Sequence, residues 1–143
     1  MNINEEGKNN YLIKKFSCGE AVVKTAQERG VLNVSDDVIR VASSFKAGLG
    51  CKGDVCGCLL AVAALIGLKY GRTNGEEDDF LVNKKTAEFY DKFKAKFNEL
   101  KCDCLTKKFK DKDAFMSAER KEFCAEIVGF AADELESDVF HKK

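Results

Sequence analysis

The sequence predicts an all-α fold, a compact bundle of about five helices that forms one domain over residues 1–143. Apolar residues recur at helical spacing in several segments, and no segment shows the strict alternation of a half-buried strand. Ser17, Ser35, Asp54 and Ser117 stand where such segments begin, and Ser and Asp are favoured helix N-caps. A chain of this length can bury roughly 70% of its unfolded surface, so it can form a core without disulfides.

The first part of the chain contains a polar start and two expected helices. Residues 1–9 are polar and are expected to fray. Ser17 and Glu20 form the Ser-x-x-Glu pattern of a capping box, which predicts a helix with Cys18 in its first turn. A second helix is expected from Asp36 to a glycine-rich turn that permits left-handed backbone conformations.

A long uncharged run at residues 55–68 predicts a buried central helix. The run is shorter than the roughly 20 residues that span a bilayer, so no membrane span is expected. Asp54 is the expected N-cap, which would make Cys56 an early helical residue. Side chains two residues apart on a helix diverge by about 200°, so Cys56 and Cys58 are not expected to face one centre.

The second half of the chain predicts two more long helices. Phe89, Phe93 and Phe97 form an apolar stripe with lysines on the opposite side, which indicates core packing rather than a nucleic-acid surface. The helix after Ser117 turns Cys124 inward.

Composition narrows the function. Lys and Arg (24) balance Asp and Glu (24), which predicts neither nucleic acid nor an anionic membrane as a partner. The N-terminus lacks the features of a signal peptide, which predicts a cytoplasmic protein with reduced thiols. There are seven cysteines but one histidine, so thiol redox chemistry or thiolate metal ligation is favoured over a mixed Cys/His site.

Three cysteines are expected in the first turns of helices, where backbone N–H groups and the helix dipole stabilise thiolates. These are Cys18, Cys56 and Cys104, the last at a short turn that Asp103 could cap. Together with the inward-facing Cys124 they would suit a tetrathiolate centre such as an iron–sulfur cluster. There is no Cys-x-x-Cys pair, so the spacing does not identify a metal, and any one of these residues could instead be a small core side chain.

Several segments resemble a known family. Residues 16–22, 55–61 and 67–72, with the single cysteines Cys104 and Cys124, look like the redox-active proteins named for a C, GCAxxG, C, C pattern. The resemblance covers roughly residues 11–135, and a related module is similar to the N-terminal part of split-Soret cytochromes c.

The resemblance implies four cysteines that act together, and these fall on Cys18, Cys56, Cys104 and Cys124. An iron–sulfur cluster is the usual proposal for the family, and dithiol redox chemistry is the alternative. This chain has Cys58 where the family has Ala, and Ala61 where it has Gly.

The sequence therefore predicts a redox-active protein that binds an iron–sulfur cluster for electron transfer to a redox partner, rather than a stand-alone catalyst. One alternative is a cofactor-free thiol–disulfide protein that pairs Cys56 with Cys18 or Cys51 with Cys58. Another is a protein that binds a thiophilic metal ion, Cu(I) or Zn, with Cys51, Cys58 and Cys102 as auxiliary ligands. Faces of small residues and the Phe stripe are compatible with a homodimer.

Overall fold

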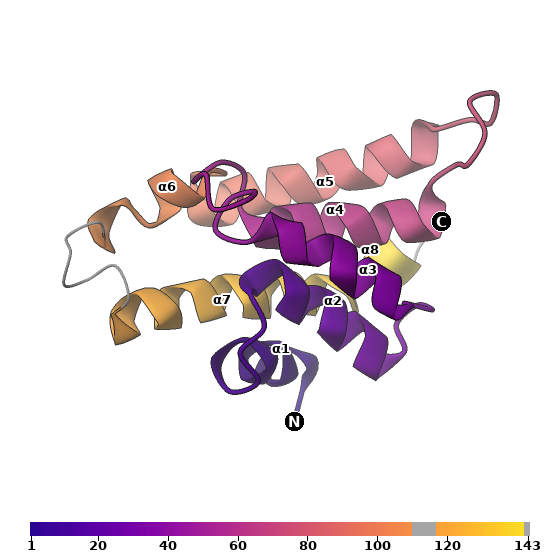
Figure 1. Cartoon of the computed structure of the whole chain (residues 1–143). Coiled ribbons are helices and arrows are strands. Elements are labelled where there is room, and N and C mark those ends of the chain that lie inside the picture. The colour runs from indigo at the N-terminus through magenta and orange to yellow at the C-terminus, as the bar shows by residue number, and fades with distance from the viewer. Residues whose placement is uncertain (110–116, 142–143) are drawn as a thin grey trace.

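The computed structural model describes residues 1–109 and 117–141, and it is all-α as predicted (Figure 1). Within these residues there are eight α-helices and two short 3-10 helices, and no strand beyond an isolated bridge between Val55 and Lys101. Five helices have ten residues or more, namely α1, α2, α4, α5 and α7. The α-helices are α1 (Ile3–Leu12), α2 (Cys18–Arg29), α3 (Asp36–Ala42), α4 (Gly57–Tyr70), α5 (Phe80–Phe97), α6 (Cys102–Leu105), α7 (Ala118–Glu134) and α8 (Asp138–His141), and the 3-10 helices are η1 (Ser43–Phe45) and η2 (Lys107–Phe109).

The start of the chain forms helix α1, where the sequence predicted fraying. The Asn2 side chain accepts a hydrogen bond from the Glu5 backbone N–H at 2.8 Å, which caps the helix. Ile3 is buried, and Gly7 lets α1 approach α7 so closely that an added Cβ would lie 3.0 Å from the Cβ of Ala132. Docking against α7 therefore orders a segment that composition alone marks as polar.

Helix α4 is the buried central helix that the sequence predicted. It packs against α2, α5 and α7 (Figure 1). Its side chains Val62, Leu65 and Ile66 are fully buried in the core. None of the helices in the described part of the chain is long and apolar enough to cross a membrane.

The N-terminus of α4 differs from the prediction, because Cys56 rather than Asp54 is the N-cap. Residues 53–56 pair with residues 100–103 through backbone hydrogen bonds on either side of the Val55–Lys101 bridge. The Cys56 N–H donates to the Leu100 carbonyl at 2.8 Å, and the Cys102 N–H donates to the Asp54 carbonyl at 2.7 Å. This pairing holds the chain extended through Cys56 and delays the start of the helix.

The Phe stripe of α5 lies in the core, as predicted. Phe89 and Phe93 are 1% and 0% exposed. Their rings lie 6.1 and 6.4 Å from the ring of Phe130 on α7.

The turn before α4 is left-handed, as the glycines predicted. Residues 47–51 all have positive φ angles, between 48° and 80°. Ala47, Leu49 and Cys51 adopt this conformation without being glycines, at a cost of about 1 kcal/mol or more each. A Cβ at Gly48 would lie 2.5 Å from the Asp54 nitrogen, so the loop folds back on itself only with glycine there.

Candidate functional site

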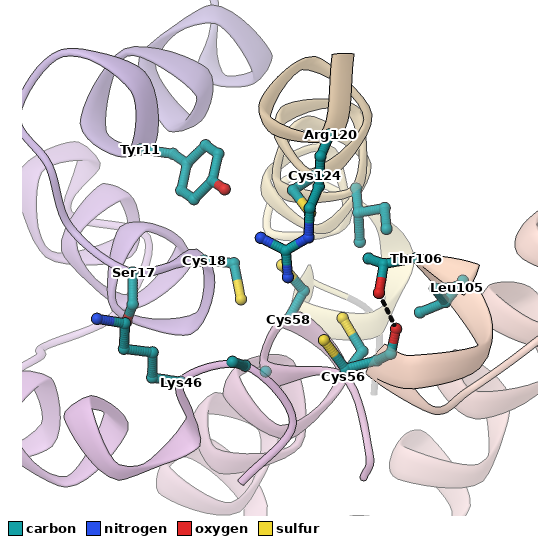
Figure 2. A pocket seen from close by; sticks show the side chains of 14 residues that line it. Tyr11, Ser17, Cys18, Lys46, Cys56, Cys58, Leu105, Thr106, Arg120 and Cys124 are labelled. Atoms are coloured by element: carbon teal, nitrogen blue, oxygen red, sulfur yellow. Dashed lines mark hydrogen bonds between the residues drawn. The ribbon is translucent and has the colours of Figure 1, made fainter. Parts of the chain in front are cut away.

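Five of the seven cysteines line one cavity of about 100 Å³ (Figure 2). They come from four separate segments: the start of α2, the start of α4, the short helix α6 and the middle of α7. The five are Cys18, Cys56, Cys58, Cys102 and Cys124.

Cys18 is the first residue of α2, and the predicted capping box holds it there. The Glu20 carboxylate accepts hydrogen bonds from the Ser17 N–H at 2.9 Å and from the Ser17 hydroxyl at 2.8 Å. The box fixes the direction in which the chain enters the helix, so Cys18 is presented to the cavity.

Cys56 and Cys58 both line the cavity, although helical geometry predicted that their side chains diverge. The divergence applies only when both residues are helical. Cys56 has φ −54° and ψ 133°, which is not helical, whereas Cys58 lies in the first turn of α4. The late start of α4 therefore brings both thiols to one place.

Two glycines let the N-termini of α2 and α4 meet. A Cβ at Gly19 would lie 2.8 Å from the Gly57 carbonyl oxygen, and a Cβ at Gly57 would lie 2.9 Å from Cys18 Sγ. Both distances are shorter than a carbon atom tolerates, so any larger residue would push the helix starts apart. Each of these glycines follows a cavity cysteine directly in the sequence.

Helix α6 contributes Cys102 to the cavity and not Cys104, the residue of this turn that the cysteine pattern predicted as a main ligand. Cys104 is exposed, because side chains two apart on a helical turn point to different sides. Leu105 is the residue in the sequence that could have identified Cys102 as the inward-facing cysteine. It is buried and lies three residues after Cys102, on the same face of the turn. Cys51 is also exposed and lies outside the cavity.

The thiols at the starts of α2 and α4 contact one another. Hydrogen bonds from the Cys56 and Cys58 thiols, with help from the Gly19 N–H, hold the pKa of Cys18 well below its ordinary value. The pKa values of Cys56 and Cys58 are raised in turn, mainly because they donate to Cys18 and also because they are buried. Among these three contacting thiols, Cys18 therefore loses its proton most readily.

Tyr11 and Arg120 complete the site, and neither is among the site residues predicted from the sequence. Burial raises the pKa of Tyr11, whose hydroxyl donates to Cys124. Burial also raises the pKa of Cys124, to about 11, while the positive charge of Arg120 opposes this rise. The Arg120 guanidinium donates to Cys102 and points into the cavity toward the cysteines (Figure 2).

The charge of the cavity favours anions. Among the described residues that line it, the charged side chains other than cysteine are Lys46 and Arg120, and no carboxylate is present. Arg120 could have been found from the sequence, since it precedes Cys124 by four residues and shares its face of the helix.

The donor set fits a thiolate-ligated cluster in kind and number, since four cysteines are the usual ligands of iron–sulfur clusters. No group of three Cys, His, Asp or Glu side chains in the described part of the chain is placed to hold a metal ion. The five thiols are instead distributed around the wall of the cavity.

Comparison with known proteins identifies a family. The family model described as putative redox-active protein (C_GCAxxG_C_C) matches residues 16–137. No curated protein and no solved structure matches the chain significantly. The matched region includes four of the five segments of ten or more residues that form helices, together with all seven cysteines. The chain therefore belongs to the C_GCAxxG_C_C family of putative redox-active proteins.

Proposed function

We propose that this redox protein holds an iron–sulfur cluster in the cysteine cavity and transfers electrons to a redox partner. The observation that carries the proposal is the convergence of five thiols, from four segments, on one cavity of about 100 Å³. Bound there, a cluster would supply one-electron transfer.

The ligands we assign take one thiol from each segment: Cys18, Cys56, Cys102 and Cys124. Cys102 replaces Cys104 of the sequence-based set, because Cys104 is exposed and does not line the cavity. Cys58 is a fifth thiol, which contacts Cys18, and we assign it as the alternative ligand. Such a centre is anionic, and the N-terminus of α2 and the Arg120 cation are placed to offset its charge.

The preference for a cluster over a single Zn or Cu(I) ion rests on the number and spread of the thiols, since five of them, from four segments, line the cavity. A reducing compartment such as the cytoplasm would keep these thiols available as ligands.

The test is reconstitution with iron and sulfide under anaerobic conditions, followed by a visible spectrum and iron analysis. Cys102→Ser and Cys104→Ser form a matched pair, since they lie two residues apart in the same turn. We expect the Cys102 variant to lose most of its iron and visible absorption, and the Cys104 variant to keep both. Wild-type protein that stays colourless and takes up no iron would overturn the proposal.

A second candidate function rests on the contact of the Cys18 thiolate with the Cys56 and Cys58 thiols. Oxidation of the Cys18 thiolate with either partner thiol breaks the S–H bond of that partner, forms one disulfide and releases one proton, and the two electrons pass to a disulfide oxidant. Iron-free protein treated with oxidised glutathione would then show an internal disulfide at Cys18 in a peptide map. An unchanged count of free thiols excludes this candidate.

A further inference from the structure

We propose that the groove directly outside the cysteine cavity binds a small molecule that carries two or more carboxylate or phosphate groups. The groove has a volume of about 690 Å³. It shares Tyr11, Cys102 and Arg120 with the cysteine cavity, so the two spaces adjoin. The inference goes beyond the proposed cluster, because the ligand would bind in the groove and not in the cysteine cavity.

The charge of the groove points to an anion. The described residues that line it include four basic side chains and two acidic ones, Glu20 and Asp103. The basic side chains are Lys15, Lys46, Arg120 and Lys121. The whole chain, by contrast, has equal numbers of acidic and basic residues, so this excess is local.

Both acidic side chains of the groove are engaged with the protein's own loops and helix starts. The Glu20 carboxylate accepts two hydrogen bonds from Ser17 in the capping box. The Asp103 carboxylate lies against Gly53, so closely that a Cβ there would be 2.2 Å from it. The Glu20 carboxylate is thus held by Ser17, and the Asp103 carboxylate lies against the Gly53 backbone.

The three lysines of the groove differ from its two acidic residues in this respect. Lys15, Lys46 and Lys121 are exposed, and none forms an ion pair in the described part of the chain. Like charges that face one concave space repel one another, and a bound polyanion would relieve that repulsion.

The shape of the site favours a small molecule over an acidic protein surface. Its volume lies within the roughly 300–1,000 Å³ of small-molecule pockets, and it is concave where a protein docking surface is usually flat. An anion held by Arg120 would lie beside the Cys102 thiol, which Arg120 also contacts. The groove is thus placed to bring a reducible or oxidisable anion to the sulfur centre.

The experiment is calorimetric titration of iron-free protein with citrate, with pyrophosphate and with an oligoglutamate peptide, at low ionic strength. The test variant is Lys15→Gln combined with Lys121→Gln, since both lysines line the groove and neither lines the cysteine cavity. The control is Lys84→Gln combined with Lys94→Gln, which removes the same charge from exposed positions on α5.

We expect citrate or pyrophosphate to bind wild-type protein, and the groove variant to raise the Kd about tenfold while the control stays within twofold. The citrate and pyrophosphate arms distinguish a carboxylate ligand from a phosphate ligand. Equal weakening in the control overturns the proposal, as does the absence of binding by either small anion. Binding of oligoglutamate alone also overturns it, in favour of an acidic protein partner. Failure of iron uptake would leave these titrations unchanged, so the two proposals fail separately.

Discussion

Gly57→Ala tests whether close contact between the starts of α2 and α4 builds the site. The added Cβ would lie 2.9 Å from both Cys18 Sγ and the Phe45 carbonyl oxygen. The carbonyl is backbone and cannot rotate away, so α4 or the preceding loop must shift. Overpacking of this kind costs roughly 1–3 kcal/mol, and removing a glycine from a helix returns up to about 1 kcal/mol.

We therefore expect Gly57→Ala to lower the free energy of unfolding by about 1–2 kcal/mol, and Tm by roughly 3–7 °C. Gly67→Ala is the matched control in the same helix, since no atom lies within 4 Å of the added Cβ. It should raise stability by about 0.5–1 kcal/mol.

The assay is urea unfolding under reducing conditions, with the rate of Cys18 alkylation as a second measurement. A displaced α4 would separate the Cys56 and Cys58 donors from Cys18, so alkylation at neutral pH should slow in Gly57→Ala only. If Gly57→Ala unfolds with the same midpoint as Gly67→Ala and reacts at the wild-type rate, the packing argument is wrong.

Three further predictions follow from the same structure. The pKa of Cys18 is held low, so its alkylation should reach half its maximal rate well below the pH of an ordinary thiol; Cys58→Ala removes one donor and should move that midpoint upward, as mass spectrometry of the labelled peptide can show. Gly53→Ala places a Cβ 2.2 Å from the Asp103 carboxylate at a residue with a φ of 73°, and it should lower the free energy of unfolding by roughly 2–3 kcal/mol. Gly50→Ala, at a φ of 60° with open space around the added Cβ, should lower it by about 1 kcal/mol in the same urea assay. Phe93→Ala empties a fully buried position and should cost roughly 3–5 kcal/mol, and a loss below about 1 kcal/mol would contradict its place in the core.

Periodicity and capping patterns were sufficient to predict the helices that are marked by residues close together in the sequence. The Ser17 capping box, the apolar run of α4 and the Phe stripe of α5 depend on residues close in sequence, and the structure confirms each of them. Helix α1 could not be predicted in the same way. Its order depends on Gly7 meeting Ala132 on α7, a contact across most of the chain.

The site shows the same division between local and long-range causes. Cys18 was placed by its capping box, and Cys124 by the apolar face of α7. The choice of Cys104 as a main ligand and of Cys58 as only an auxiliary one both depended on where a helix begins. That point is set by the pairing of residues 53–56 with residues 100–103, which no local pattern encodes.

Electrostatics links the cavity to the groove. Lys46 and Arg120 line both spaces, and no carboxylate among the described residues lines the cavity. Reduction would add negative charge to a cluster bound in the cavity, so these shared cations would favour its reduced state. An anion bound in the groove would offset the same cations and lower the reduction potential. Because such coupling is reciprocal, reduction would also weaken anion binding. If both proposals hold, the protein would bind its anion most tightly when oxidised and release it on reduction, which is the order that an electron carrier serving an anionic donor requires.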